Sequence, residues 1–159
     1  MAFEKYVKVP GSEREPMRGA TKSGSLDPNA VMQVTLVLRP RASGPKQESL
    51  DKLVASGKRL SREEYEARYG AAPADVKQVE AFASAHGLAL AEVDLAARSV
   101  VLTGRCADFA KAFHVQLARY EYEGGSYRGR TGAVNIPAEL DGIVVGVDGL
   151  DDRPQAEAH

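Results

Sequence analysis

The chain's first regular element reads Val31-Met32-Gln33-Val34-Thr35-Leu36-Val37-Leu38. Apolar side chains occupy every second position from Met32 to Leu38, a pattern typical of a strand with one buried face. Pro40 ends the strand, because proline has no backbone N–H to donate to a neighbouring strand. The buried face needs other elements to cover it, so the segments that follow determine the architecture.

Two helices are predicted after this strand. Ser61-Arg62-Glu63-Glu64 has the form of a capping box and opens a short helix that ends near Gly70. Pro73 suits the first turn of a second helix, which ends at Gly87. Its apolar face is formed by one helical stripe of side chains: Val76, Val79, Phe82, Ala83 and His86.

The second half of the chain alternates strands with short helices. Residues 88–95 and 99–102 are predicted strands joined by the turn at 96–98, with a bulge between Leu90 and Val93. Further elements follow in order: a helix at 107–114 that buries Phe109 and Phe113, a strand at 115–122, a turn at Gly124-Gly125 and a short helix at 137–140. Residues 144–147 either continue that helix or form an edge strand.

The order strand, helix, strand, strand, helix, strand predicts an α+β fold. The predicted arrangement is ferredoxin-like, an antiparallel sheet with two helices on one face. Residues 1–30 are rich in proline and glycine and are interpreted as an extended arm. The folded domain then covers residues 31–150, and the polar residues 151–159 form a tail.

Composition narrows the function classes. The 21 Lys and Arg residues nearly balance 22 Asp and Glu residues, which argues against a dedicated nucleic-acid binder, because such proteins neutralise phosphates with a basic face. The single cysteine, Cys106, excludes an internal disulfide and is interpreted as a small buried residue. There is no run of about 18 apolar residues to span a membrane. The N-terminal residues also lack the apolar core of a signal peptide.

The sequence carries no recognisable catalytic or metal-binding pattern. His86 and His114 are expected at helix ends, where an imidazolium interacts well with the helix dipole. No pair of histidines has the spacing of a zinc site, and no Gly-x-Ser-x-Gly elbow is present. The glycines at 124–125 lie between strand-like segments, so they favour a hairpin turn over a phosphate site. We therefore expect no catalytic residue, no metal and no cofactor.

Seven segments, taken in order, resemble the propeptides of sedolisin-type, kumamolisin-like serine peptidases. The first follows the pattern L-[ST]-x-x-E-[FY]-x-x-x-[FY]-G, and the similarity extends from about Val31 to the end of the chain. Arg105-Cys106 departs from the family, which usually places a small or hydroxyl residue there to cap the helix. The similar segments are residues 60–70, 79–88, 100–104, 109–113, 127–132, 136–140 and 147–150.

The resemblance implies a role that composition does not show. Such propeptides precede a subtilisin-fold catalytic domain with a Ser-Glu-Asp triad and a bound calcium ion, neither of which is expected in this chain. They assist folding of that domain, block its active site and are removed autocatalytically in acid. The implied partner is the cognate peptidase domain, in cis or in trans, and the implied location is extracellular. Two alternatives stay open: a stand-alone inhibitor of the same fold, and a ferredoxin-like ligand- or RNA-binding module.

The residues expected to act on the peptidase lie mostly at the C-terminal end. The tail is expected to lie across the active-site cleft, because extended peptides pair well with such clefts. Acidic side chains near the interface are expected to loosen the complex in acid: Asp141 and Asp148, together with Asp151 and Asp152 of the tail. The tail residues are Asp151, Asp152, Arg153, Pro154, Gln155, Ala156, Glu157, Ala158 and His159.

Overall fold

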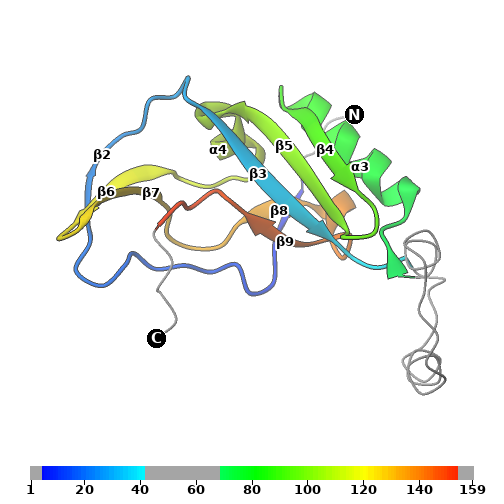
Figure 1. The fold of residues 1–159 in the computed structure, drawn as a ribbon, viewed down its shortest axis with the longest axis horizontal. Helices are drawn as coiled ribbons and strands as arrows, with labels where there is room; N and C mark the ends of the chain where they lie inside the picture. Colours follow the sequence, from blue (N-terminus) through cyan, green and yellow to red (C-terminus); the bar gives the residue numbers. More distant parts are fainter. Residues whose placement is uncertain (1–4, 42–68, 154–159) are drawn as a thin grey trace, which may run out of the picture.

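The computed structural model of the chain describes residues 5–41 and 69–153 (Figure 1). The predicted short helix opened by residues 61–64 therefore lies outside the described residues. The helices are α3 (Pro73–Ala85), α4 (Cys106–Ala112) and the 3-10 helix η1 (Ala138–Leu140). The strands are β1 (Tyr6–Lys8), β2 (Thr21–Gly24), β3 (Val31–Leu38), β4 (Ala89–Asp94), β5 (Ser99–Arg105), β6 (Ala118–Tyr122), β7 (Gly125–Gly129), β8 (Asn135–Pro137) and β9 (Val144–Asp148).

The central sheet has the strand order β4-β5-β3-β9, and all neighbours are antiparallel. In chain order, the first and third strands lie in the middle, and a helix follows each of the first and third strands, which is the ferredoxin-like topology. The bulge predicted in the second strand is present between Leu90 and Glu92. The α+β, ferredoxin-like prediction is confirmed.

The fourth strand of this sheet is not the predicted one. The sequence pattern gives that place to residues 115–122, but β9 occupies it, so residues 144–147 form an edge strand. Val144 and Val147 pack on the main core, whereas Ala118 and Tyr120 of β6 join a separate cluster. Both segments form strands, which their tyrosine and valine residues favour, but packing partners decide which sheet each strand enters.

Both helices cover the same face of the central sheet, as Figure 1 shows. Met32, Val34, Leu36 and Leu38 of β3 point into this interface, as their alternation predicts. Three phenylalanines fill it from the helical side. Phe82 of α3 meets the ring of Phe113 edge-on at 5.3 Å, and Phe109 of α4 is fully buried. α3 begins at Pro73 and is followed by Gly87 at φ +72°, which matches the predicted ends.

The start of α4 lacks a side-chain cap, as the departure at Arg105-Cys106 suggests. The first amides of this helix are instead bonded by carbonyls of the preceding loop. Cys106 N donates to Ala30 O, and Ala107 N donates to Pro28 O. The guanidinium of Arg105 also pairs with Asp108 one turn later. The loop before β3 thus does the work of a capping side chain.

The described part of the N-terminal arm, residues 5–30, is extended but pairs with the rest of the chain. β1 pairs with β8, and β2 pairs with β6 to form the sheet β2-β6-β7. Val9 is buried in the main core. Tyr6 stacks on the ring of His114 at 3.4 Å and lies within hydrogen-bond distance of His86. The division at residues 30 and 150 stays a prediction.

Candidate functional site

Among the described residues, no helix or strand covers the face of the central sheet opposite the helices. Its side chains are those that alternate with the core positions, and the register places them in rows across the strands. Thr35 lies at the middle of this face, between Val101 of β5 and Asp148 of β9. Val31, at the end of β3, is 76% exposed. We call this surface the open face; its members are Val31, Gln33, Thr35, Val37, Ala89, Glu92, Asp94, Ser99, Val101, Thr103, Arg105, Gly146 and Asp148.

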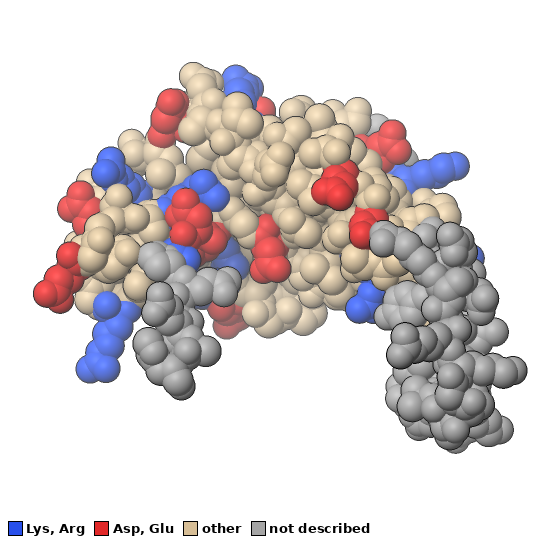
Figure 2. Space-filling model, in the orientation of Figure 1, with Lys and Arg blue, Asp and Glu red and all other residues tan. Residues whose placement is uncertain are grey.

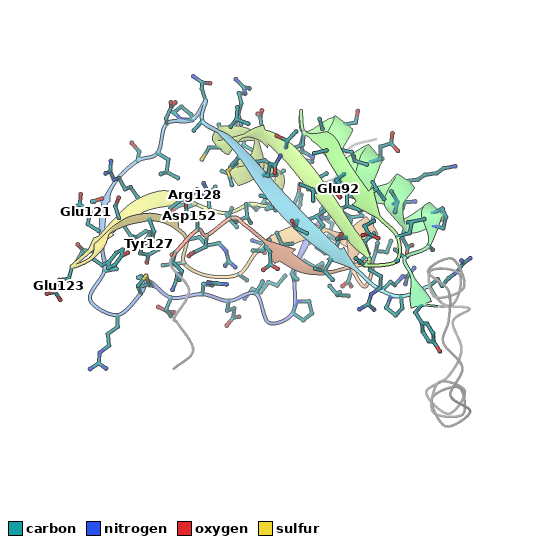
Figure 3. The ribbon with its side chains drawn as sticks, viewed as in Figure 1. Glu92, Glu121, Glu123, Tyr127, Arg128 and Asp152 are labelled. Carbon is teal, nitrogen blue, oxygen red and sulfur yellow. The ribbon has the colours of Figure 1, made fainter. Side chains whose placement is uncertain are left out.

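The open face is largely uncharged at its centre, and its charges are acidic apart from Arg105, which pairs with Asp108 at the end of β5. Figure 2 shows a broad surface without lysine or arginine over β3 and β5, with acidic side chains at intervals. Glu92, which Figure 3 labels over this sheet, lies opposite Val101. A surface of small apolar and hydroxyl groups with a few carboxylates suits a protein partner that presents hydrogen-bond donors or cations. None of its members is aromatic, so it offers no ring on which RNA bases could stack.

The chain leaves β9 and is fixed against β7 by a set of polar contacts. The guanidinium of Arg128 donates to Gly149 O at 2.7 Å and to Leu150 O at 2.9 Å. Arg128 N donates to the carboxylate of Asp152, and Asp152 N donates back to Arg128 O. Figure 3 shows Arg128, Asp152 and Tyr127 together beside the hairpin formed by β6 and β7. We call residues 149–153 the C-terminal clasp.

A buried ion pair completes the clasp. The guanidinium of Arg153 contacts both carboxylate oxygens of Asp151, at 2.9 and 2.6 Å, and the side chain of Asp151 is only 2% exposed. Arg153 also lies over the ring of Tyr127, 5.2 Å from its centre. Burial alone raises the pKa of Asp151, but hydrogen bonds from Arg153 and the charges of Arg153 and Arg14 outweigh it and hold the pKa below its ordinary value. Asp151 is therefore satisfied within the chain.

The lowered pKa of Asp151 predicts an acid-sensitive clasp. A lowered pKa contributes stability that is present above the unfolded value of 3.8 and is lost as the pH falls through the folded value. We expect Asp151→Asn to reduce the free energy of unfolding by about 1–3 kcal/mol at pH 7, because a buried cation loses its counter-charge. The difference from the native chain should shrink below about pH 4.

Urea unfolding at pH 7, 5 and 3 measures this difference. Asp141→Asn is the matched control, since Asp141 is exposed and a surface change of this kind alters stability by about 0.5 kcal/mol or less. A loss in Asp151→Asn that is equally large at pH 7 and pH 3 would rule out the carboxylate as its source.

The structure places the predicted acidic residues in three different environments. Asp148 lies on the open face, and Asp141 is exposed after η1. Asp151 and Asp152 belong to the clasp with Arg153, and Pro154, Gln155, Ala156, Glu157, Ala158 and His159 lie outside the described residues. The predicted roles of these residues toward a peptidase stay predictions.

The other sequence-level candidates lie in the interior or at helix ends. Cys106 is buried, and burial raises the pKa of its thiol. The charge of Arg128 lowers this pKa and that of Asp27 raises it, but both effects are smaller than that of burial. His86 is the C-cap of α3 and donates from Nδ1 to Phe82 O at 2.9 Å. His114 follows α4 at φ +48°. Within the described residues, no three His, Cys, Asp or Glu side chains gather closely enough to hold a metal ion.

Of the residues on the open face, sequence reasoning names only Asp148 as an interface residue. Gln33, Thr35 and Val37 are the outward members of the same alternation that predicts the core, and that alternation was the available signal. It predicts that they face away from the helices. It does not distinguish a face that meets water from one that meets a partner.

The fold and the open face define a class of protein domain. It is a small ferredoxin-like domain in which one face of the sheet is not covered by the described residues and the chain leaves through the clasp. Residues 18–153 match the family model described as Pro-kumamolisin, activation domain. The chain belongs to this family.

Two curated relatives agree with this assignment. Kumamolisin from Bacillus sp. (strain MN-32) is 32% identical over 160 residues, which cover 98% of this chain and 29% of the relative. Tripeptidyl-peptidase sed5 from Aspergillus fumigatus is 25% identical over 162 residues, which cover 90% of this chain and 28% of the relative. The chain thus spans less than a third of the length of each relative.

Across residues 5–41 and 69–153, no helix is long and apolar enough to cross a bilayer.

Proposed function

We propose that this chain is the propeptide of a secreted, acid-activated serine peptidase, which it helps to fold and which it inhibits until autocatalytic removal. Its partner is the cognate peptidase domain, and it performs no catalysis itself. The family membership supports the association with a peptidase. The observation that carries the proposal is the open face, a preformed sheet surface with one large exposed valine and no covering element among the described residues.

The open face serves as the docking surface in this proposal. Its centre, Thr35 with Val37 and Val101, is flat and uncharged, so it can be desolvated at low cost against apolar atoms of the partner. The carboxylates of Glu92 and Asp148 on the flanking strands then meet donors or cations of the peptidase. Acid weakens the attraction between carboxylates and cations, which loosens the complex under the conditions in which the peptidase acts.

The clasp fixes the position at which the tail leaves the domain. Residues 149–153 are fixed to β7, so the chain leaves the domain at a defined place beside the open face. A rigid exit reduces the entropy lost when the following residues bind along the cleft. Residues 154–159, the part of the expected tail beyond the clasp, then bind across the cleft in an extended form.

The tail's contribution can be separated from that of the open face. A chain ending at Arg153 keeps the clasp and the open face but lacks residues 154–159. We expect this deletion to weaken inhibition of the cognate peptidase at pH 7 by about tenfold or more while the dissociation constant changes by about threefold or less, since docking rests on the sheet.

Inhibition is measured with a peptide substrate, and binding is measured by calorimetry with a peptidase inactivated at its nucleophile. Replacing residues 154–159 by an equal length of glycine and serine controls for chain length. Equal inhibition by the deleted and complete chains would refute the role of the tail.

A further inference from the structure

A polar groove runs along the free edge of the central sheet. It lies between the outer edge of β9 (residues 145–148) and the N-terminal loop of residues 9–12, and it has a volume of about 170 Å³. β9 is the last strand of its sheet, so among the described residues no strand pairs with this edge. No residue of the clasp lines the groove. It shares Gly146 and Asp148 with the open face, but the proposed docking makes no use of the arginines that line it.

Arg130 lines this groove and is almost completely buried, with 4% of the residue exposed. Its Nη1 donates to Ser12 O at 2.8 Å and to Gly132 O at 2.7 Å. Its Nε is buried and has no hydrogen-bond partner in the structure. A guanidinium is always charged and presents five donors, so Arg130 is held by neutral carbonyls with part of its donor capacity unused.

The charges around Arg130 do not balance it. Arg14 lines the same groove, and within the described residues neither arginine lies within 4 Å of a carboxylate oxygen. Asp151 is nearby, but it is committed to Arg153 at 2.6 Å. Asp148 lines the groove from the β9 side without forming an ion pair with either arginine. A buried, uncompensated charge is costly, and a second cation beside it adds to that cost.

The pKa of Arg130 agrees with this local excess of positive charge. Burial lowers it from the ordinary value, and Arg14 and Arg153 lower it further, whereas Asp151 opposes the change. A ligand that brings negative charge and oxygen acceptors into the groove would relieve both the unused donors and the repulsion.

We propose that the groove between β9 and residues 9–12 is a carboxylate-binding site, with Arg130 and Arg14 as its cationic groups. The flat guanidinium groups match the two oxygens of a carboxylate. The free edge of β9 provides backbone groups beside them, so a carboxylate carried on an extended polypeptide is held as well as a free one. Asp148 repels the ligand and limits its affinity.

Acetate is the probe, titrated into the complete chain at pH 6.5 with sodium chloride at equal ionic strength as the reference. The readouts are the Nε–Hε resonance of Arg130 and the backbone amides of Ser12 and Gly146 in nuclear magnetic resonance spectra. We expect saturable shifts with a dissociation constant in the millimolar range, on the order of 1–50 mM for so small a ligand. Linear shifts that chloride reproduces would overturn the proposal.

Substitutions of exposed charged residues in and around the groove test the proposed carboxylate site and leave Arg130 unchanged. Arg14→Gln should raise the dissociation constant for acetate by about five- to tenfold, and Asp148→Asn should lower it by about three- to tenfold, because each alters one unit charge beside the ligand. The controls Arg18→Gln and Asp141→Asn make the same charge changes at exposed residues that do not line the groove. Equal constants for Arg14→Gln, Asp148→Asn and the controls would contradict the site.

The same titration identifies the source of the carboxylate. If the peptidase domain supplies it, an equimolar amount of that domain abolishes the acetate response of Arg130, and Arg14→Gln weakens the complex. If the site takes free carboxylates, the response persists in the complex. Both results support the site. The acetate titration of the chain alone does not depend on the proposed inhibition, so the two proposals fail separately.

Discussion

A single charge at the centre of the open face, Thr35→Arg, should weaken inhibition of the cognate peptidase at pH 7 by about a hundredfold or more. Thr35 lies between Val101 and Asp148, so the new guanidinium would be enclosed on docking. Desolvating this charge on docking costs several kcal/mol, and the longer side chain also holds the partner away from the centre of the face; about 1.4 kcal/mol corresponds to each factor of ten. The measurement is the inhibition constant with a peptide substrate.

The fold of the free chain should tolerate this substitution. Thr35 is only half-buried, and the carboxylate of Asp148 lies opposite it on β9. We expect the free energy of unfolding to change by less than about 1 kcal/mol. Gln78→Arg is the matched control, since it adds the same charge on the exposed side of α3, which covers the other face of the sheet. If both variants inhibit like the native chain, the open face is not the docking surface.

Gly149→Ala should produce the largest loss of stability among the single substitutions considered. Gly149 has φ +106°, and a β-carbon there would lie 2.9 Å from Gln33 O and 3.4 Å from the α-carbon of Val34. Backbone strain and the clash with β3 each cost about 1–3 kcal/mol, so the free energy of unfolding should fall by about 2–6 kcal/mol. Equilibrium unfolding in urea measures this loss.

Gly142→Ala separates the two causes of that loss. Gly142 also has a positive φ, of +78°, but a β-carbon there would meet no atom within 4 Å. It should therefore cost only the backbone strain, about 1 kcal/mol. The difference between the two variants measures how closely the chain crosses β3 on its way to the clasp. Equal losses of unfolding free energy in the two variants would mean that the close approach of Gly149 to β3 does not contribute to the loss.

Local patterns predict most elements of the central sheet and its helices. The alternation in β3, Pro73 and Gly87 at the ends of α3, and the bulge after Leu90 all depend on neighbours a few residues away. The choice between residues 115–122 and β9 for the fourth strand depends on contacts across the whole chain. Val144 packs on Leu38 and the helical layer, and no local rule gives that preference.

The candidate sites are harder to predict, because they consist of residues brought together from distant segments. The tail pattern predicts a solvated Asp151, whereas the ring of Tyr127 and the backbone of β7 create the place where Asp151 and Arg153 are buried together. Likewise, Arg130 belongs to a segment that resembles the family. Its burial arises only when residues 9–12 fold back across it.

The central claim is that this chain binds and blocks a peptidase domain, and its inhibition of the cognate mature peptidase is the most direct test. The chain is titrated against a fixed amount of peptidase at pH 7 and again at pH 3. We expect complete inhibition at pH 7, with a constant on the order of a micromolar or tighter, and a constant about a hundredfold weaker at pH 3. Full peptidase activity at pH 7 in the presence of a large excess of folded chain would contradict the claim.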